Sequence, residues 1–485
     1  MLLASALTPV LFLLLAAVGG PVRGTGAEAA AARVEPGRAF AFLSELQTKH
    51  PGRWRRQRAW LEAPAFVGSA LVAAGATDLR LERGPYGKDE LTNVRAVIPG
   101  VDRTTRVILA AHHDTVNGAP GAIDDGGAVA CLVEAARVLA SGPPPGCDVE
   151  LAVYDLEEQG LVGSKAHIRG LPAGEKERVR AVLALELVGW KNDSLVLHTI
   201  PKAFATRAKG VPPAWLPAAV RAAAGDAGSS IGLGDPLVGP WYQATVRVIG
   251  VKTGSDADAW LEAGVPACLL TGSSLTNFYA SYHLPTDDLP QVDPARLDDA
   301  ARVAVAAAVE LAALPATVTG AREQGDVYLL VGARVVDRVG LALLGVAAAL
   351  TSLVTSLALL GTSARRHPPE AGGSARAPGA RPVLAGLVLA FAVGVASLAL
   401  LPSLVGLVTC GPLALGVALA STVSRGRRRL VLYAAAFPAL AEVILVSAAA
   451  AMFGGFDWIG GPVETLLLAL TLGLGLTCCS ALVRA

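Results

Sequence analysis

The chain has 485 residues, of which 53% are hydrophobic and 17% are charged, and its mean hydropathy is +0.51. These values lie outside the range of ordinary soluble domains and indicate that part of the chain resides in a lipid bilayer. Forty-one Lys and Arg residues nearly balance forty Asp and Glu residues, so a nucleic-acid-binding protein is not expected. The six cysteines show neither zinc-finger spacing nor the density of a disulfide scaffold, and pairing of Cys131 with Cys147 stays open.

The first residues form an apolar run, MLLASALTPVLFLLLAAVGG, that has the length of a secretory signal peptide. Small residues after this run would allow cleavage near Ala27 or Ala29. Because no positive charge precedes the run, an uncleaved signal anchor is the alternative. We therefore assign residues 1–27 to a signal peptide or signal anchor.

A second apolar zone begins at Val339, continues to the last residue, and is interrupted by two arginine-bearing loops. It divides into five segments of membrane-spanning length, near residues 339–361, 383–402, 403–423, 430–452 and 463–482. Both loops follow odd-numbered segments, so the positive-inside rule places them in the cytoplasm and all residues before Val339 on the exported side. In the fourth segment, Glu442 is either a functional carboxylate or a protonated side chain bonded within the bundle.

Residues 28–325 are long enough for one large domain or two small ones, and residues 326–338 would link them to a transmembrane domain, residues 339–485. Strand-like runs such as TRVILAAHH, DVELAVYDLEE and RAVLALELVG alternate with helix-like segments. The first of these segments has apolar residues at helical spacing from Val129 to Leu139, and SGPPPGC ends it. This alternation predicts an α/β domain with a mostly parallel central sheet.

Polar residues gather where these strands end, which is where ligands bind in open α/β sheets. The set comprises His112 and Asp114 after the first run, Asp124 in the next loop, Glu157 and Glu158 after the second, Glu186 at the end of the third, and His283 in a later polar turn. Two imidazoles and several carboxylates, one of them able to bridge, suit two zinc ions. This mixture of nitrogen and oxygen ligands disfavours calcium and magnesium.

Each feature also has an ordinary structural interpretation. The HxD pair can be a hydrogen-bonded surface pair, and the adjacent glutamates can form a solvated turn. The two adjacent aspartates favour a turn in which Asp125 is the N-cap of the following helix. Glu186 follows four apolar residues and, if buried, needs a partner such as an arginine. The combination, in this order, is far more specific than its parts.

The chain resembles the co-catalytic di-zinc metallopeptidases of clan MH, which include secreted leucyl aminopeptidases and glutamate carboxypeptidase. The resemblance rests on six motifs in order: AHHDTV, GAIDDGGAV, LEEQGLVGS, LALELVGW, GSDADAWLEAGVPA and YHLPTDDL. It covers roughly residues 90–310, and membrane-embedded members with several C-terminal spans resemble the whole architecture. It implies a three-layer αβα domain. It also implies a membrane-anchored exopeptidase that acts on peptides in the exported compartment, and an aminopeptidase is the favoured type.

The resemblance also assigns site residues by position. It implies that one zinc ion is held by His112, Asp124 and Glu186, and the other by Asp124, Glu158 and His283, with Asp124 bridging the two. Two zinc ions per chain are therefore expected.

The neighbouring residues receive supporting roles from the same resemblance. Asp114 would accept a hydrogen bond from the far nitrogen of His112 and fix its ring. Glu157 would take the proton of the attacking water as general base and deliver it to the leaving amine as general acid. A cis peptide bond is expected at Asp124–Asp125. His113 is interpreted as a packing or surface residue.

Two departures from the family pattern concern the site. Glu186 stands where many relatives have aspartate, and Ala257 replaces a common histidine. The loop over residues 199–248 matches no motif, so the sequence does not predict specificity. Five aromatic residues either line a substrate pocket or pack in the fold, and packing is favoured: Trp241, Tyr242, Phe278, Tyr279 and Tyr282.

Two alternative functions remain open at this point. The first is a glutaminyl-cyclase-like transferase with a single zinc ion, which the altered residue Glu186 supports. The second is a catalytically silent receptor-like homologue, which the complete ligand set disfavours. Oligomeric state is not predicted.

Overall fold

The computed structural model of the chain describes residues 26–198, 206–208, 212–229, 231–233, 251–273, 277–319, 329–331 and 334–336. Gly19–Asp326, with Leu330–Val335, form one compact unit. Most of the predicted N-terminal segment, the five predicted spans with Glu442, and the aromatic residues Trp241 and Tyr242 lie outside the described residues. In the described ranges, no helix combines the length and apolar character needed to cross a bilayer.

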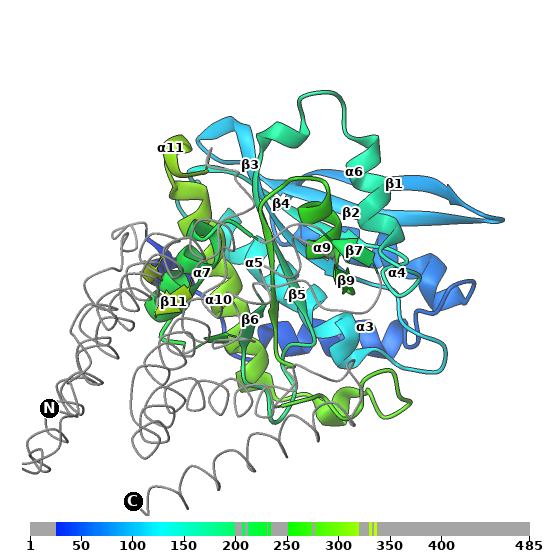
Figure 1. Cartoon of the computed structure of the whole chain (residues 1–485). Helices are drawn as coiled ribbons and strands as arrows, with labels where there is room; N and C mark the ends of the chain where they lie inside the picture. The colour runs from blue at the N-terminus through cyan, green and yellow to red at the C-terminus, as the bar shows by residue number, and fades with distance from the viewer. Residues whose placement is uncertain are drawn as a thin grey trace, which may run out of the picture. The chain divides into compact units, whose positions relative to one another are not determined.

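An eight-stranded mixed sheet forms the centre of this unit (Figure 1), and its strands lie in the order β1-β2-β4-β3-β5-β10-β6-β8. The strands are β1 (Thr77–Tyr86), β2 (Asp89–Ile98), β3 (Asp102–His112), β4 (Cys147–Tyr154), β5 (Val179–Glu186), β6 (Val196–His198), β8 (Gly232–Leu233) and β10 (Ala267–Thr271). The central strands β4, β3, β5 and β10 are parallel to one another, whereas β2 pairs with β4 and β6 pairs with β10 in antiparallel fashion. The predicted α/β class with a mixed, centrally parallel sheet is confirmed.

Helices cover both faces of the sheet. One face carries α2 (Ala27–Ala31), α3 (Arg38–Lys49), α4 (Arg58–Ala73), α5 (Gly127–Ala140), α7 (Trp215–Asp226) and α10 (Pro294–Ala313). The other face carries α6 (Val162–Gly170) and α9 (Asp256–Glu262). Helix α11 (Ala316–Thr319) follows α10, and short strands pair as β7 (Thr206–Ala208) with β9 (Val251–Thr253) and β11 (Leu329–Val331) with β12 (Arg334–Val336).

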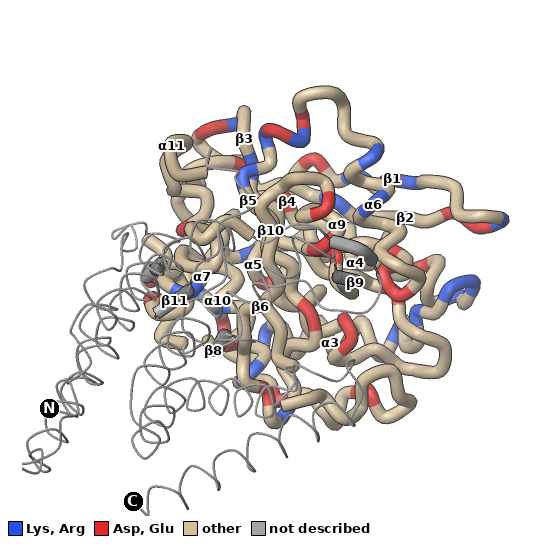
Figure 2. The backbone as a smooth tube through the Cα atoms, viewed as in Figure 1, with Lys and Arg blue, Asp and Glu red and all other residues tan. Residues whose placement is uncertain are grey.

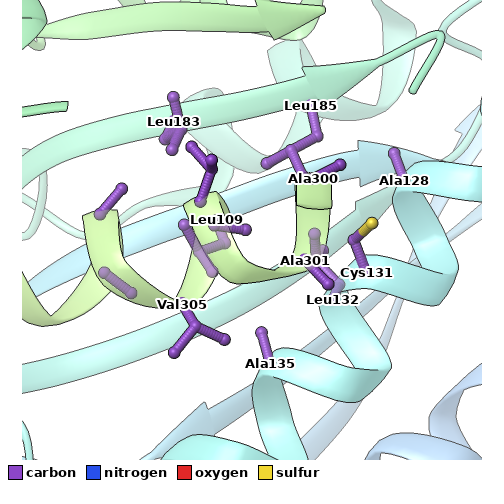
Figure 3. Packing of buried hydrophobic residues seen from close by; sticks show 14 of the residues in the cluster. Leu109, Ala128, Cys131, Leu132, Ala135, Leu183, Leu185, Ala300, Ala301 and Val305 are labelled. Carbon is purple, nitrogen blue, oxygen red and sulfur yellow. The ribbon is translucent and has the colours of Figure 1, made fainter. Parts of the chain in front are cut away.

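The core lies on both sides of the sheet because successive residues of a strand point to opposite faces. In β3, Val107 and Leu109 belong to the larger cluster beneath α5 and α10, whereas Ile108 and Ala110 belong to the cluster beneath α9. Figure 3 shows the larger cluster, where Leu109, Leu183 and Leu185 meet side chains from α5 and α10. Burial on both faces explains why these strands read as continuous apolar runs.

Several local predictions are confirmed. The runs read as strands correspond to β3, β4 and β5, and the helix expected after the aspartate pair is α5, which ends at Ala140. Cys131 and Cys147 are both buried and free, so they do not form a disulfide. Figure 2 shows Lys and Arg interspersed with Asp and Glu over the described fold, with both signs at the tip of the β1–β2 hairpin.

Candidate active site

The site lies at the edge of the sheet where the central parallel strands end. His112 is the last residue of β3 and pairs with Tyr154, the last residue of β4. Glu186 is the last residue of β5 and pairs with Thr271, the last residue of β10. Because the carboxyl ends of parallel strands meet at one edge, residues far apart in the sequence converge there.

Three predicted ligands come together as a compact group. Nε2 of His283 lies 3.3 Å from Oδ2 of Asp124 and 3.1 Å from Oε2 of Glu158. One ligand atom from each of the three residues lies within 4.8 Å of the others, the spacing expected around a single metal ion. Among the described residues, this is the group of three that meets this spacing.

His112 lies on the other side of Asp124. Its Nε2 atom is 3.4 Å from Oδ1 of Asp124, so the two oxygen atoms of this carboxylate face different imidazoles. Nε2 of His112 is also 4.0 Å from Oε2 of Glu157. This geometry is compatible with a bridging Asp124, although His112 and Glu186 do not form a second group of the same spacing in the described ranges. Binding of two metal ions stays a prediction.

The donor set fits a metal ion because its buried atoms lack ordinary hydrogen bonds. Four such atoms, all buried and without a hydrogen-bond partner, are His112 Nε2, Asp124 Oδ2, Glu158 Oε1 and His283 Nε2. Buried polar atoms are normally paired, and an unpaired one costs free energy. Zinc accepts imidazole nitrogen and carboxylate oxygen as ligands, so these residues suit a bound zinc ion.

The charges in this group perturb one another when no cation is present. Burial, followed by the charge of Asp124, raises the pKa of Glu158 to about 7. Burial lowers the pKa of His283, but its contacts with Asp124 and Glu158 raise it to about 10. Burial and the nearby Glu186 raise the pKa of Glu157. A divalent cation would relieve this crowding of carboxylates.

Asp114 holds the glutamate pair in place, a role the sequence did not predict. Its Oδ1 accepts a hydrogen bond from the backbone N–H of Glu157 at 2.9 Å, and its Oδ2 accepts one from that of Glu158 at 3.2 Å. The ring of His112 is fixed differently from the expectation, because its Nδ1 lies 3.1 Å from the backbone carbonyl of Asp114 and 3.6 Å from the carboxylate. Asp114 therefore orients the ring through its main chain.

The expected helix cap at Asp125 is wrong. The N-cap of α5 is Gly126, and the Asp125 carboxylate instead accepts the backbone N–H of His112 at 3.2 Å. The peptide bond between Asp124 and Asp125 is cis, as expected. His113 is fully buried, with Nε2 3.1 Å from the backbone carbonyl of Thr92, which confirms a packing role.

Glu186 is buried at the end of β5 and acts electrostatically on the same site. Its charge contributes to raising the pKa of Asp125, Glu157 and Asp256. Left-handed backbone conformations flank this part of the site, at Leu187 and at His283 itself. Non-glycine residues in this conformation are uncommon and cluster at functional sites.

Sequence reasoning missed Asp287, which supports the segment bearing Asp124. Oδ1 of Asp287 accepts hydrogen bonds from the backbone N–H of Ile123 at 2.9 Å and the hydroxyl of Tyr279 at 2.8 Å. Oδ2 accepts the backbone N–H of Asp124 at 3.2 Å. The signal in the sequence was its position four residues after His283, in the motif YHLPTDDL.

The aromatic residues divide between packing and exposure. Tyr279 is buried in the core and its hydroxyl donates a hydrogen bond to Asp287, which confirms packing there. Tyr282 stacks on the imidazole of His283 with ring centroids 3.7 Å apart, and Phe278 meets Tyr282 edge-on. Phe278 is 60% exposed, so an apolar surface borders the site.

Comparison with known proteins matches this region to a family model. Residues 93–308 match the family model described as Peptidase family M28. Leupeptin-inactivating enzyme 1 of Streptomyces exfoliatus is 27% identical over 267 residues, which cover 53% of this chain and 58% of that enzyme. Leucine aminopeptidase 1 of Ajellomyces capsulatus is 31% identical over 144 residues, covering 27% of this chain and 36% of that protein. The chain thus spans less than two thirds of the length of these relatives.

A solved structure shares the fold. The crystal structure of Legionella pneumophila LapA aligns with a TM-score of 0.51 at 20% identity, covering 61% of this chain and 79% of that one. The group formed by Asp124, Glu158 and His283 lies within the segment that the family model matches. The segment that carries the site is thus similar to peptidase family M28 over residues 93–308.

Proposed function

We propose that this protein is a zinc-dependent aminopeptidase that removes N-terminal residues from peptides. One observation carries the proposal: Asp124, Glu158 and His283 place their ligand atoms within 4.8 Å of one another, in a segment that matches the model of peptidase family M28. The name of one relative, leucine aminopeptidase 1, supports cleavage from the N-terminus.

The reaction would combine metal chemistry with one proton-transfer group. Zinc ions bound at this site would lower the pKa of a water molecule and polarise the scissile carbonyl. Glu157 would take the proton of the attacking water and deliver it to the leaving amine. Its side chain is 4.0 Å from His112 Nε2, and Asp114 fixes its backbone, so it borders the ligands without joining the group of three.

The exposed aromatic surface beside His283 supports a preference for apolar N-terminal residues. Phe278 and Leu284 are both exposed, and the ring of Tyr282 connects Phe278 to the imidazole. Burying an apolar side chain against such a surface gains about 25 cal/mol for each Å² removed from water. We expect leucyl and phenylalanyl substrates to be hydrolysed faster than aspartyl or lysyl ones.

A matched pair of variants tests the assigned mechanism. The full-length chain, supplied with zinc, is assayed with aminoacyl p-nitroanilides of several residue types. Glu157→Gln should lower kcat by roughly 10²- to 10⁴-fold, the usual contribution of general acid–base catalysis, with the bound zinc retained. Glu45→Gln in α3, an exposed glutamate paired with Lys49, should leave kcat unchanged. Full activity in Glu157→Gln would refute the role of Glu157.

Zinc content tests the ligand assignment independently of activity. We expect two zinc ions per full-length chain by plasma mass spectrometry, and loss of one in each of His112→Ala and His283→Ala. A single zinc ion that survives His112→Ala would favour the cyclase-like alternative, which the one compact ligand group supports. Formation of pyroglutamyl product from an N-terminal glutaminyl peptide would then establish that alternative. Zinc binding without turnover of either substrate class would indicate a silent homologue.

We also propose that residues 339–482 anchor the protein in a membrane, with the peptidase domain on the exported side. The five apolar segments and the arginine-bearing loops support this proposal. Alkaline phosphatase, which is active only after export, should be active when fused after residue 337 and inactive when fused within residues 366–381. The opposite pattern would overturn the orientation.

A further inference from the structure

Arg53, in the loop between α3 and α4, is a fully buried arginine whose partners are backbone carbonyls. Its Nε donates to the carbonyl of His113 at 2.6 Å, and its Nη2 donates to the carbonyl of Gly121 at 2.7 Å. Its Nη1 donates to the carbonyls of His50 at 3.1 Å and Pro120 at 3.5 Å. One planar guanidinium group therefore contacts both ends of the segment 113–121.

That segment joins two of the predicted metal ligands. His112 immediately precedes it, and Asp124 follows it by three residues. Further hydrogen bonds tie the segment to the same loop and to α3. The N–H of Thr115 donates to the carbonyl of Arg53 at 3.2 Å, and Nε2 of Gln47 donates to the carbonyl of Gly121 at 2.7 Å. The path of the chain between the two ligands is thus set by contacts with Arg53 and its neighbours.

The positive charge of Arg53 lies among the carboxylates of the site. Burial lowers the pKa of its guanidinium to about 10, and the surrounding aspartates oppose this shift, with Asp287 first, followed by Asp114, Asp125 and Asp124. Arg53 therefore remains charged at neutral pH. In the described ranges, no carboxylate oxygen lies within 4.0 Å of its nitrogen atoms. The group acts on several carboxylates at once and pairs directly with none.

We propose that Arg53 is a positioning residue that sets the separation of His112 and Asp124 before zinc binds. The inference rests on the proposed function, because it assumes that these two residues are zinc ligands. The segment 113–121 would be free to adopt other paths without the guanidinium, and zinc binding would then have to order it. Ordering a segment costs backbone entropy, and this cost would reduce the affinity for zinc.

Lysine would not replace arginine in this role. A guanidinium is a rigid planar fork that can donate to two separated carbonyls, whereas an ammonium is a single point of positive charge. Arg53→Lys keeps the charge and most of the volume but loses the simultaneous contacts with His113 and Gly121. It therefore separates the effect of geometry from the effect of charge.

A second arginine provides a matched control. Arg180, at the start of β5, is also largely buried and donates from Nη1 to the carbonyls of Ala312 at 3.0 Å and Leu314 at 3.1 Å. It lies at the opposite end of the strand from Glu186. Arg180→Met should therefore lower thermal stability without changing zinc affinity.

The experiment uses the full-length chain and compares wild type with Arg53→Lys, Arg53→Met and Arg180→Met. Zinc affinity is measured by competition with a chelator, and backbone exchange of residues 113–121 is measured by hydrogen–deuterium exchange in the zinc-free protein. Both Arg53 variants should bind zinc about 10- to 100-fold more weakly, the usual loss when a group that orients metal ligands is removed. Their segment 113–121 should also exchange faster than in wild type.

The outcomes separate the two proposals. Zinc affinity and backbone exchange at wild-type values in Arg53→Lys would overturn the positioning role. If Arg180→Met lost as much zinc affinity as the Arg53 variants, the effect of Arg53 would reflect the general stability of the domain. If wild type binds no zinc, the proposed function fails, and the exchange of residues 113–121 in the variants still decides whether Arg53 holds the segment. If Arg53→Met does not fold, Arg53→Lys provides the comparison.

Discussion

The carboxylate of Asp287 should be among the strongest supports of the candidate site. It is fully buried and accepts three hydrogen bonds, from the N–H of Ile123, the N–H of Asp124 and the hydroxyl of Tyr279. Asp287→Asn keeps the shape of the side chain but replaces one acceptor oxygen by an amide donor. The new NH₂ group would then face a backbone N–H or the tyrosine hydroxyl.

The expected magnitude follows from these three bonds. Hydrogen bonds to a charged group contribute about 1.5–3 kcal/mol and neutral ones about 0.5–1.5 kcal/mol, so two retained bonds lose about 1 kcal/mol each. An unpaired buried donor at the third position costs about 1–3 kcal/mol more. The sum, about 3–5 kcal/mol, should lower the Tm of a domain of this size by roughly 10 °C.

The assay is thermal unfolding of the zinc-free full-length chain, followed by near-ultraviolet circular dichroism. Asp288→Asn is the control, because that neighbouring aspartate is exposed and accepts one hydrogen bond, from the N–H of Leu289 at 2.7 Å. Asparagine caps a helix about as well as aspartate, so the effect of this variant should stay at about 0.5 kcal/mol or less. Equal Tm values for Asp287→Asn and Asp288→Asn would refute the reasoning that the buried hydrogen bonds of Asp287 stabilise the site.

Two further predictions concern a glycine and a buried histidine. Gly121 has a φ of +78°, and an added Cβ would lie 2.2 Å from a Thr115 side-chain atom and 2.9 Å from the carbonyl oxygen of Asp124. Gly87 is also at positive φ but has nothing within 4 Å of an added Cβ, so Gly87→Ala should cost only about 1–2 kcal/mol. Gly121→Ala should destabilise the domain more than Gly87→Ala in urea unfolding and should also weaken zinc binding in chelator competition. Burial lowers the pKa of His167 to about 3, so unfolded chains bind a proton below pH 6.5 that the folded chain does not, and stability should fall as pH drops from about 6.5 to about 3. The loss of stability amounts to about 1.36 kcal/mol per pH unit, or about 2.7 kcal/mol at pH 4.5. His167→Gln should lack this pH-dependent loss when urea unfolding of the zinc-free protein is compared at pH 7 and pH 4.5. An equal difference in unfolding free energy between the variant and wild type at both pH values would contradict the prediction.

The sequence alone determined the local elements and the identity of the candidate ligands. The apolar runs correspond to β3, β4 and β5. A strand that is buried on both faces has a continuous apolar sequence, and such a run can be recognised without knowledge of the tertiary structure. His112 and Glu186 could be placed at strand ends for the same reason. The order of six motifs then indicated a family, and residues 93–308 match the model of peptidase family M28.

The tertiary structure decided how these residues are held. Asp125 is a good N-cap by sequence, yet its carboxylate accepts the N–H of His112, which the fold brings to it from the end of β3. Asp287 reaches Asp124 across 163 positions of the chain, and Arg53 reaches Gly121 across 68. Such contacts depend on how strands and loops pack in space, and the local periodicity of the sequence does not predict them. The sequence could therefore name the chemical groups of the site, whereas only the folded chain showed which buried charges and hydrogen bonds hold them in place.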